Sequence, residues 1–241
     1  MKYKIYYKRN LPHFQPPGDT FFVTYRLNDS LPVEVILRLK AEREKYLKRI
    51  AGFDNKEIRV EKYRAGQTLY FEKFDALLDK AGFGPVWLKD EKAAQIVKDA
   101  LHFYDKKKYD LICYTILPNH VHQVFTPILN PRNVVSGYKI VGRISDSTGE
   151  EVNEVTPSNK VSQYIVTKIL QDLKKYTAVK CNKILNRSGA FWQHESYDHV
   201  VRNTDELQRI IRYVINNPVK ARFCDDPEEW KWTYCNFDLI I

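Results

Sequence analysis

The sequence lacks several features that would tie it to a particular compartment or cofactor. It has only four cysteines in 241 residues and no C-x-x-C pair, which disfavours a zinc knuckle. No apolar run approaches the roughly 20 residues that a membrane-spanning helix needs. The first residues, MKYKI, contain no apolar signal region. We therefore expect a soluble protein of the reducing cytoplasm that makes no contact with a membrane.

Positive charge and aromatic rings are abundant instead. The chain is 44% hydrophobic and 29% charged, so it can bury a core and is not a disordered chain. Its 39 Lys and Arg outnumber its 30 Asp and Glu, which gives a net charge of +9. That balance favours a polyanionic partner, most simply nucleic acid. The 16 Tyr, 12 Phe and 4 Trp include rings that could stack on bases, although core packing accounts for most of them.

The order of apolar patterns predicts one large α+β domain over residues 1–241. Strand patterns and helical periodicity alternate along the chain, so we expect one antiparallel sheet with helices packed on one face. The strands are predicted at 21–27, 109–117 and 120–126, and the helices at 30–50, 69–81, 90–104, 162–185 and 204–217. The aromatic segment 190–199 is compatible with either a strand or a loop.

Three segments lie outside this pattern. Residues 1–19 are basic and then Pro-rich, and we expect this arm to form no regular element. Residues 128–160 are polar and have no helical period, so they are predicted to be an inserted loop, apart from a hairpin that could form around 138–141. Residues 222–241 form a C-terminal tail.

Two histidines one residue apart give the strongest chemical signal. His120 and His122 lie in the stretch LPNHVHQVF at 117–125. Alternate residues of a strand share a face, so both imidazoles are expected on one side of the sheet. Two neutral imidazoles side by side suit a divalent metal ion. The alternative is that both histidines simply face water or a partner.

A tyrosine on the last predicted helix could complete this site. Tyr213 and Asn217 lie one turn apart at the edge of the helix's buried side, and Pro218 is expected to end the helix. A tyrosine oxygen beside a metal-bound phosphodiester can attack phosphorus. An amide oxygen from Asn217 together with two imidazoles suits Mg²⁺ or Mn²⁺ better than a closed zinc site. The alternative is a half-buried tyrosine with a packing role.

These motifs together resemble a known family. The stretch 113–122, CYTILPNHVH, resembles the His-hydrophobic-His block of the single-tyrosine HUH transposases. The segments GAFWQ at 189–193, YDH at 197–199, RN at 202–203 and YVINNPVKA at 213–221 resemble one branch, the REP-associated tyrosine transposases. The tail PEEWKW at 227–232 and the Pro-Gly pair at 17–18 also resemble that branch. The resemblance covers most of the chain except 51–66 and 128–160, and it departs at Leu117, where Met is common, and at Phe223, where Leu after a Gly is frequent.

The resemblance implies a fold, an activity and site residues. It implies a ferredoxin-like HUH core with the histidines on the open face of its sheet. Tyr213 would cut one DNA strand and stay joined to the 5′ phosphate, with His120 and His122 as metal ligands and Asn217 as a third or indirect one. The substrate would be a DNA hairpin with single-stranded flanks, with no nucleotide cofactor. The branch implies a monomer rather than a helix-swapped dimer.

Basic residues on the arm and on helix 162–185 are the candidates for DNA contact. Lysines and arginines there would bind phosphates and make the affinity depend on salt. The candidates are Lys8, Arg9, Lys168, Lys174, Lys175, Lys180, Lys183, Arg187 and Arg202. Phe191 or Trp192 could stack on an unpaired base, although burial is the simpler role for both.

Three other interpretations compete with a transposase. The chain could be a domesticated protein that binds DNA hairpins without transposing. It could be a metallohydrolase with a water nucleophile, although such sites usually add an Asp-His pair close behind the histidines. Tyr197 could replace Tyr213 as the nucleophile, since His194 and His199 lie near it in the sequence. We expect those two histidines to support the site or bind phosphate.

Overall fold

The computed structural model describes residues 5–8, 12–129 and 164–239. Most of the predicted loop 128–160 lies outside these residues, as does the hairpin considered around 138–141. The chain divides into two compact units. The described part of the first is 5–8, 12–30, 85–129 and 164–239, and the described part of the second is Leu31–Gly84. None of the helices in the described ranges is long and apolar enough to cross a bilayer.

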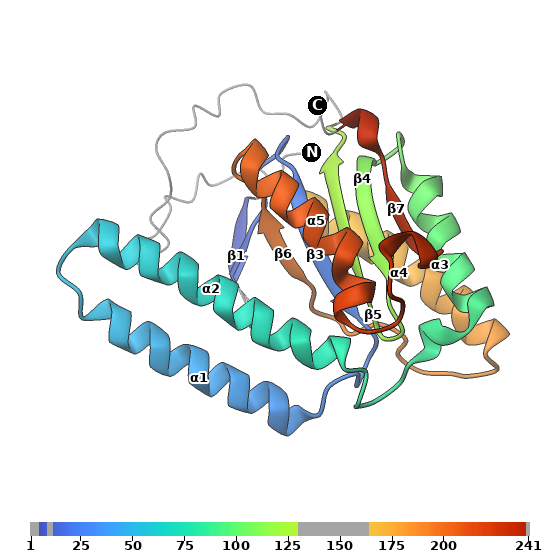
Figure 1. Ribbon diagram of the computed structural model, residues 1–241, viewed down its shortest axis with the longest axis horizontal. Helices are drawn as coiled ribbons and strands as arrows, with labels where there is room; N and C mark the ends of the chain where they lie inside the picture. Colours follow the sequence, from blue (N-terminus) through green and yellow to red (C-terminus); the bar gives the residue numbers. More distant parts are fainter. Residues whose placement is uncertain (1–4, 9–11, 130–163, 240–241) are drawn as a thin grey trace, which may run out of the picture. The chain divides into compact units, whose positions relative to one another are not determined.

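A five-stranded sheet is the centre of the first unit (Figure 1). Every pair of neighbouring strands is antiparallel. Across the sheet the strands are β6 (Tyr197–Val200), β3 (Phe21–Arg26), β5 (His120–Pro127), β4 (Tyr109–Ile116) and β7 (Thr233–Cys235). The first four strands have the order of a ferredoxin-like sheet, and β7 adds a fifth beside β4. The predicted α+β class and ferredoxin-like core are confirmed.

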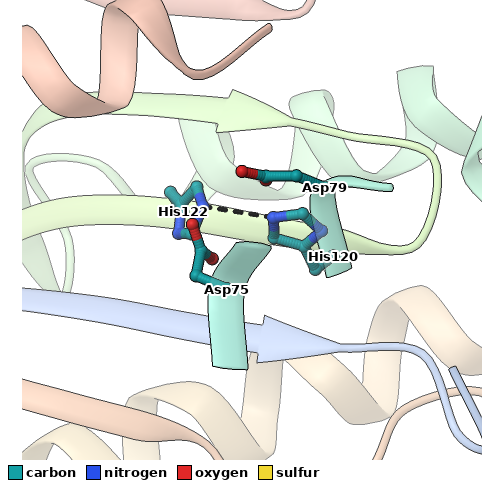
Figure 2. A group of neighbouring side chains, drawn as sticks. All are labelled: Asp75, Asp79, His120 and His122. Atoms are coloured by element: carbon teal, nitrogen blue, oxygen red, sulfur yellow. Dashed lines mark hydrogen bonds between the residues drawn. The ribbon is translucent and has the colours of Figure 1, made fainter. Parts of the chain in front are cut away.

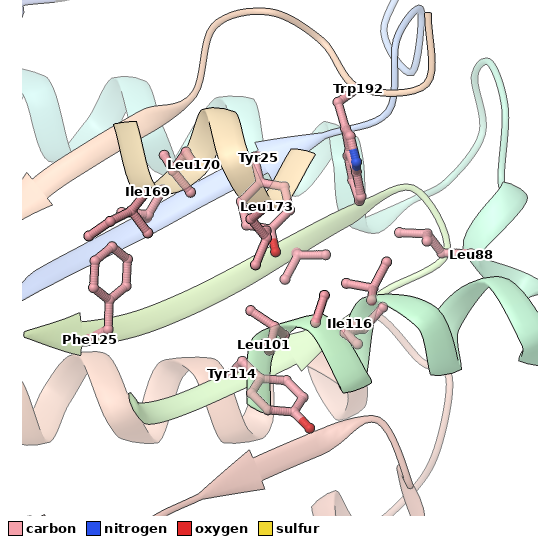
Figure 3. Packing of buried hydrophobic residues seen from close by; sticks show 14 of the residues in the cluster. Tyr25, Leu88, Leu101, Tyr114, Ile116, Phe125, Ile169, Leu170, Leu173 and Trp192 are labelled. Atoms are coloured by element: carbon pink, nitrogen blue, oxygen red, sulfur yellow. The ribbon is translucent and has the colours of Figure 1, made fainter. Parts of the chain in front are cut away.

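Two helices cover one face of this sheet. They are α3 (Glu91–Tyr104) and α4 (Ile165–Ile184), and the side chain of Asp90 caps the start of α3 by accepting from the backbone N–H groups of Lys92 and Ala93. Residues at every third or fourth position of α4 pack onto alternate residues of the strands. Figure 3 shows this core, which includes Tyr25, Leu101, Tyr114, Phe125, Ile169, Leu173 and Trp192. Each large side chain contributes roughly 1.5–3 kcal/mol by leaving water.

The other face of the sheet carries α5 (Thr204–Lys220), which contacts β4, β5 and β7. The predicted stop at Pro218 is wrong, because the helix continues to Lys220. A proline inside a helix removes one backbone hydrogen bond. Here the next N–H groups are satisfied, since Ala221 donates to the carbonyl of Asn217 at 2.8 Å and Phe223 donates to that of Pro218 at 2.9 Å. The helix therefore tolerates the loss of this one backbone hydrogen bond in its last turn.

Strand β4 contains a bulge that decides which side chains reach each face. Its pairing with β5 shifts by one residue between Leu111 and Cys113. Leu111 and Tyr114 both belong to the core beneath α3 and α4. Cys113 is buried on the opposite face and stands directly across from Cys235 of β7. The extra residue thus changes the phase of the side chains along the strand.

The N-terminal arm forms a regular element, contrary to the prediction. Strands β1 (Tyr6–Lys8) and β2 (Pro12–Phe14) pair as a small antiparallel sheet. Buried His13 bonds through Nδ1 to Asp198 of β6, and its Nε2 lies 3.6 Å from Glu195. Burial alone would lower the pKa of His13, but its bonds to these carboxylates outweigh that effect and raise the pKa to about 9. The stacked ring of Tyr7 adds a further contact.

The second unit is a helical hairpin of α1 (Val33–Ala51) and α2 (Lys56–Asp79). Helix α2 begins well before the predicted start at residue 69, and the side chain of Asn55 caps it through the N–H of Ile58. The first half of α2 buries few side chains, so hydrophobic periodicity could not reveal it. The predicted Ser30 cap of α1 is also wrong, because Pro32 occupies the cap position.

Candidate active site

Strand β5 presents both histidines on the face of the sheet that carries α5. His120 and His122 are fully buried, and Val121 between them belongs to the core on the other face. The neighbouring strands hold β5 on both sides, with Thr24 of β3 and Thr115 of β4 in register with His122. A central strand paired on both sides cannot slip, because a one-residue shift would turn both imidazoles into the core.

Hydrogen bonds to neighbouring residues orient the two rings, and Figure 2 shows the rings next to each other. Nδ1 of His120 bonds to Oδ1 of Asn119 at 2.6 Å, and Nδ1 of His122 bonds to Oγ1 of Thr24 at 2.7 Å. The two Nε2 atoms lie 3.1 Å apart. The amide oxygen of Asn119 can only accept, so the neutral ring of His120 carries its proton on Nδ1 and presents a lone pair on Nε2.

This donor set fits a divalent metal ion. Histidines that bind a metal through one nitrogen usually bond through the other to a carbonyl, carboxylate or water, which fixes the ring. Asn119 supplies such a carbonyl to His120, and the hydroxyl of Thr24 takes the same place on His122, with the two Nε2 atoms converging. The oxygen atoms of Asn119 and Thr24 therefore act as orienting partners, and the two Nε2 atoms are the ones that could hold the ion.

Tyr213 reaches this face of the sheet from α5. Its ring lies 5.6 Å from that of His122 and 6.0 Å from that of Phe22, measured between ring centroids. The Nδ2 of buried Asn217 donates to Oη of Tyr213 at 3.3 Å. The structure thus brings together the tyrosine, the asparagine and the histidine pair that the sequence singled out. A phenol oxygen beside two imidazoles can act as a nucleophile if a substrate is polarised there.

The beginning of α5 is anchored to strand β6. The side chain of Asn203 accepts from the N–H of Glu206 at 2.8 Å, whereas the carboxylate of Glu206 accepts from the N–H of Arg202 at 2.7 Å. The same carboxylate lies 3.0 Å from Nε2 of His199. Burial raises the pKa of Glu206, but the bonds to His199 and Arg202 outweigh it and lower the pKa to about 2. This ionised carboxylate fixes the helix that carries Tyr213.

The second unit contains an acidic pair that the sequence analysis did not single out. Asp75 and Asp79 lie one turn apart on α2, and both are buried. Carboxylates are ligands that Mg²⁺ and Mn²⁺ prefer. The first unit thus offers two imidazoles, and the second unit by itself offers two carboxylates, as groups that could bind a metal ion. The four-residue spacing within a helix was visible in the sequence, but an acidic pair at that spacing usually marks a solvated face.

Comparisons with known proteins give a structural likeness. No family model matches the sequence, and no curated protein matches it either. The fold is similar to that of a transposase. The matching structure is described as a REP-associated tyrosine transposase bound to a REP hairpin, with a TM-score of 0.47 and 14% sequence identity. The match covers 94% of this chain and 80% of that one. The chemistry of the site stands on this chain's own residues.

The residues predicted to contact DNA fall into different structural roles. Exposed side chains on α4 include Lys168, Lys175, Lys180 and Lys183, of which Lys168 pairs with Asp172 at 2.7 Å. Arg9 lies outside the described residues, and Lys8 ends β1. Three others hold the fold together: Lys174, Arg187 and Arg202.

Contacts within the protein explain why Lys174 and Arg187 have structural roles. Nζ of Lys174 donates to the carbonyl of Gln193 and to Oγ of Ser196, and burial followed by the charge of Arg26 lowers its pKa to about 7. The guanidinium of Arg187 lies over the ring of Trp87, 3.5 Å from its centroid. A lysine that is only partly charged near neutral pH is a weak ligand for phosphate.

Strand β3 separates the strand of the rival tyrosine from the strand of the histidine pair. Tyr197 of β6 is on the same face of the sheet, where its ring lies 6.3 Å from that of Phe22 and 6.5 Å from that of His199. The ring of His199 contacts Glu206 instead of the histidine pair. The predicted supporting role of His199 agrees with this placement, because the residue anchors α5.

Proposed function

We propose that this chain is a metal-dependent single-strand DNA endonuclease and transposase that cuts at DNA hairpins. Tyr213 is the nucleophile, and the intermediate is a 5′-phosphotyrosine. The observation that carries the proposal is the contact between the rings of Tyr213 and His122, with 5.6 Å between their centroids, on the face where the Nε2 atoms of His120 and His122 converge.

The covalent step exchanges one phosphoester bond for another. The Oη of Tyr213 attacks the phosphorus of one phosphodiester, and the bond from phosphorus to the 3′ oxygen breaks. The phenol loses its proton, and the departing 3′ oxygen gains one to become a hydroxyl. Asn217 holds the phenol in position through Nδ2. The new phosphotyrosine bond keeps the energy of the broken one, so no nucleotide cofactor is required.

His120 and His122 would hold Mg²⁺ or Mn²⁺, with Asn217 as a third or indirect ligand. When bound, the ion supplies positive charge that polarises the phosphodiester. The bonds from Asn119 and Thr24 keep the two imidazoles in the orientation that binding requires.

The exposed lysines of α4 would bind another part of the DNA. They are on the helix that covers the face of the sheet opposite the histidines, so the sheet separates them from Tyr213. A hairpin with single-stranded flanks is long enough to contact both regions, because duplex DNA rises about 3.4 Å per base pair. We therefore propose that Lys175, Lys180 and Lys183 bind phosphates that lie away from the cleavage site.

A covalent-adduct assay tests the proposal. The protein is incubated with a single-stranded hairpin DNA and Mg²⁺ or Mn²⁺, and a denaturing gel is examined for protein joined to DNA. We expect an adduct with the wild type and none with Tyr213→Phe. Tyr197→Phe is the matched control, since it removes a phenol oxygen from the same face of the sheet. An adduct that persists in Tyr213→Phe would contradict the assignment of the nucleophile.

The alternative is a domesticated protein that binds DNA hairpins without transposing. Tyr213, His120 and His122 are all present and meet on one face, which favours retained chemistry. Binding of the hairpin without any adduct from the wild type would support the alternative. Cutting that leaves no adduct would point instead to a water nucleophile.

A further inference from the structure

We propose that Lys220 binds the phosphate that Tyr213 attacks. This inference rests on the proposed function and adds a substrate-contacting residue to the site. Nζ of Lys220 lies over the ring of Tyr213, 5.0 Å from the ring centroid. Lys220 is seven residues after Tyr213 on α5, so two turns of helix bring both side chains to the same side.

Exposure places Lys220 where a ligand can reach it. Its side chain is exposed, whereas Asn217 one turn before it is fully buried. A lysine carries its charge on a flexible four-carbon stem. Rotation of that stem can move Nζ from the ring of Tyr213 toward oxygen atoms on a phosphorus joined to Oη.

The negative charge of the attacked phosphate favours a cation beside it during the reaction. The attacked phosphorus carries negative charge on its nonbridging oxygens, and a positioned lysine stabilises such charge at a phosphoryl group. The histidine pair would hold its ion on the strand, while Lys220 approaches the phosphate from the helix. The two positive charges would therefore be supplied by different elements of the first unit.

Lys220 also stands in the last turn of α5, where a cation favours the helix dipole. That contribution is the same whether or not DNA is bound. Lys220→Arg retains the positive charge at the helix end and can still reach a phosphate, whereas Lys220→Gln removes the charge. Arg212→Gln is the matched control, because it removes an exposed cation from another side of the same helix.

The test compares two kinds of DNA. One hairpin has its natural scissile phosphate, and the other has an uncharged methylphosphonate at that position. Affinities are measured by fluorescence anisotropy with Tyr213→Phe protein, in which no cutting occurs. We expect the methylphosphonate to weaken binding about 10-fold with Lys220 present, as for the loss of a charge-assisted hydrogen bond. With Lys220→Gln the same change in the DNA should have a clearly smaller effect, because only the ion held by the histidines still interacts with the charge of the phosphate.

Adduct formation by otherwise native protein provides the second readout. In a single turnover we expect Lys220→Gln to be slower by 10-fold or more, and both Lys220→Arg and Arg212→Gln to remain within a few-fold of the wild type. An unchanged rate in Lys220→Gln, together with the full methylphosphonate penalty, would overturn the inference and leave the proposed function standing. A wild type that forms no adduct overturns both. Thermal unfolding of each variant confirms that it folds.

Discussion

Thr24 bonds to Nδ1 of His122 at 2.7 Å, whereas Thr115, on the other side of the same histidine, bonds to Thr233 at 2.8 Å. The two threonines are both in register with His122. Only Thr24 orients the ring of His122. Variants of the two threonines therefore distinguish the effect of this hydrogen bond from the effect of packing around the histidine.

We expect Thr24→Val to weaken metal binding and Thr115→Val to leave it nearly unchanged. Loss of an orienting partner typically costs 10- to 100-fold in metal affinity. The measurement is binding of Mn²⁺ followed by electron paramagnetic resonance, which needs no substrate. Equal affinities for the two variants would contradict the proposed orienting role, and His122→Ala provides the reference for a missing ligand.

The lysines of α4 are expected to contribute to DNA affinity through charge alone. Replacing Lys175, Lys180 or Lys183 by Gln should lower the slope of log affinity against log salt by about 0.7–0.9 for each phosphate that is no longer bound. The measurement is hairpin binding over a range of salt concentrations. Arg187→Gln should instead lower the thermal stability, because the guanidinium stacks on Trp87. A salt slope that stays the same in the α4 variants would remove this helix from the DNA-binding surface.

The N-terminal sheet is expected to lose its attachment to β6 as the pH rises. The pKa of His13 is raised to about 9 from its ordinary 6.5 by Asp198 and Glu195. Its stabilising effect is therefore complete below about pH 6.5 and disappears as the pH passes 9. After allowance for screening by solvent, the loss should be about 1–2 kcal/mol. Chemical unfolding of the wild type and of His13→Gln across this range tests it, and the variant should show a flatter profile.

Cys113 and Cys235 are expected to form a disulfide under oxidation. They face each other across β4 and β7, and the N–H of Asn236 donates to the carbonyl of Ile112 at 2.8 Å. This bond marks the cysteines as a non-hydrogen-bonded pair, whose Cα atoms lie about 4.5 Å apart, within the range that a disulfide spans. Burial raises the pKa of both thiols, to about 11 for Cys235, so the reaction should be slow at neutral pH.

Oxidised glutathione is the reagent for this test, because each disulfide formed converts one molecule of it to two thiols. Peptide mapping should find Cys113 joined to Cys235, with Cys181 and Cys224 outside that bond. A link between Cys113 and Cys224 instead would mean that the register of β7 is wrong.

The sequence predicted the sheet core because its strands are rich in β-branched and aromatic residues and its turns carry proline and asparagine. The histidine pair followed from the alternation of side chains along a strand, since Val121 faces the core and its two neighbours face the other way. The placement of Tyr213 could also be predicted, because helical periodicity puts it beside the buried stripe that contains Ile211 and Val214. These features depend on local patterns of residues.

The features that the sequence did not reveal depend on contacts between distant segments. Every residue from Leu111 to Ile116 is compatible with burial, so nothing local indicated the bulge or the face that Cys113 occupies. Orienting partners such as Thr24 are recognised only when strand register is known. The short strands β1, β2 and β7 have three residues each, too few for a periodic pattern.

The anchoring of α5 at both ends leads to a prediction about which copy of the chain Tyr213 serves. Its start is tied to β6 through Glu206 and His199, and the chain that follows it returns to the sheet as β7. We therefore expect the nucleophile and the histidines of one site to belong to one polypeptide. Mixing Tyr213→Phe protein with His120→Ala protein should therefore restore no cutting. Neither chain can combine its intact residues with those of the other chain in one active site. Activity regained in the mixture would mean that helices are exchanged between two chains.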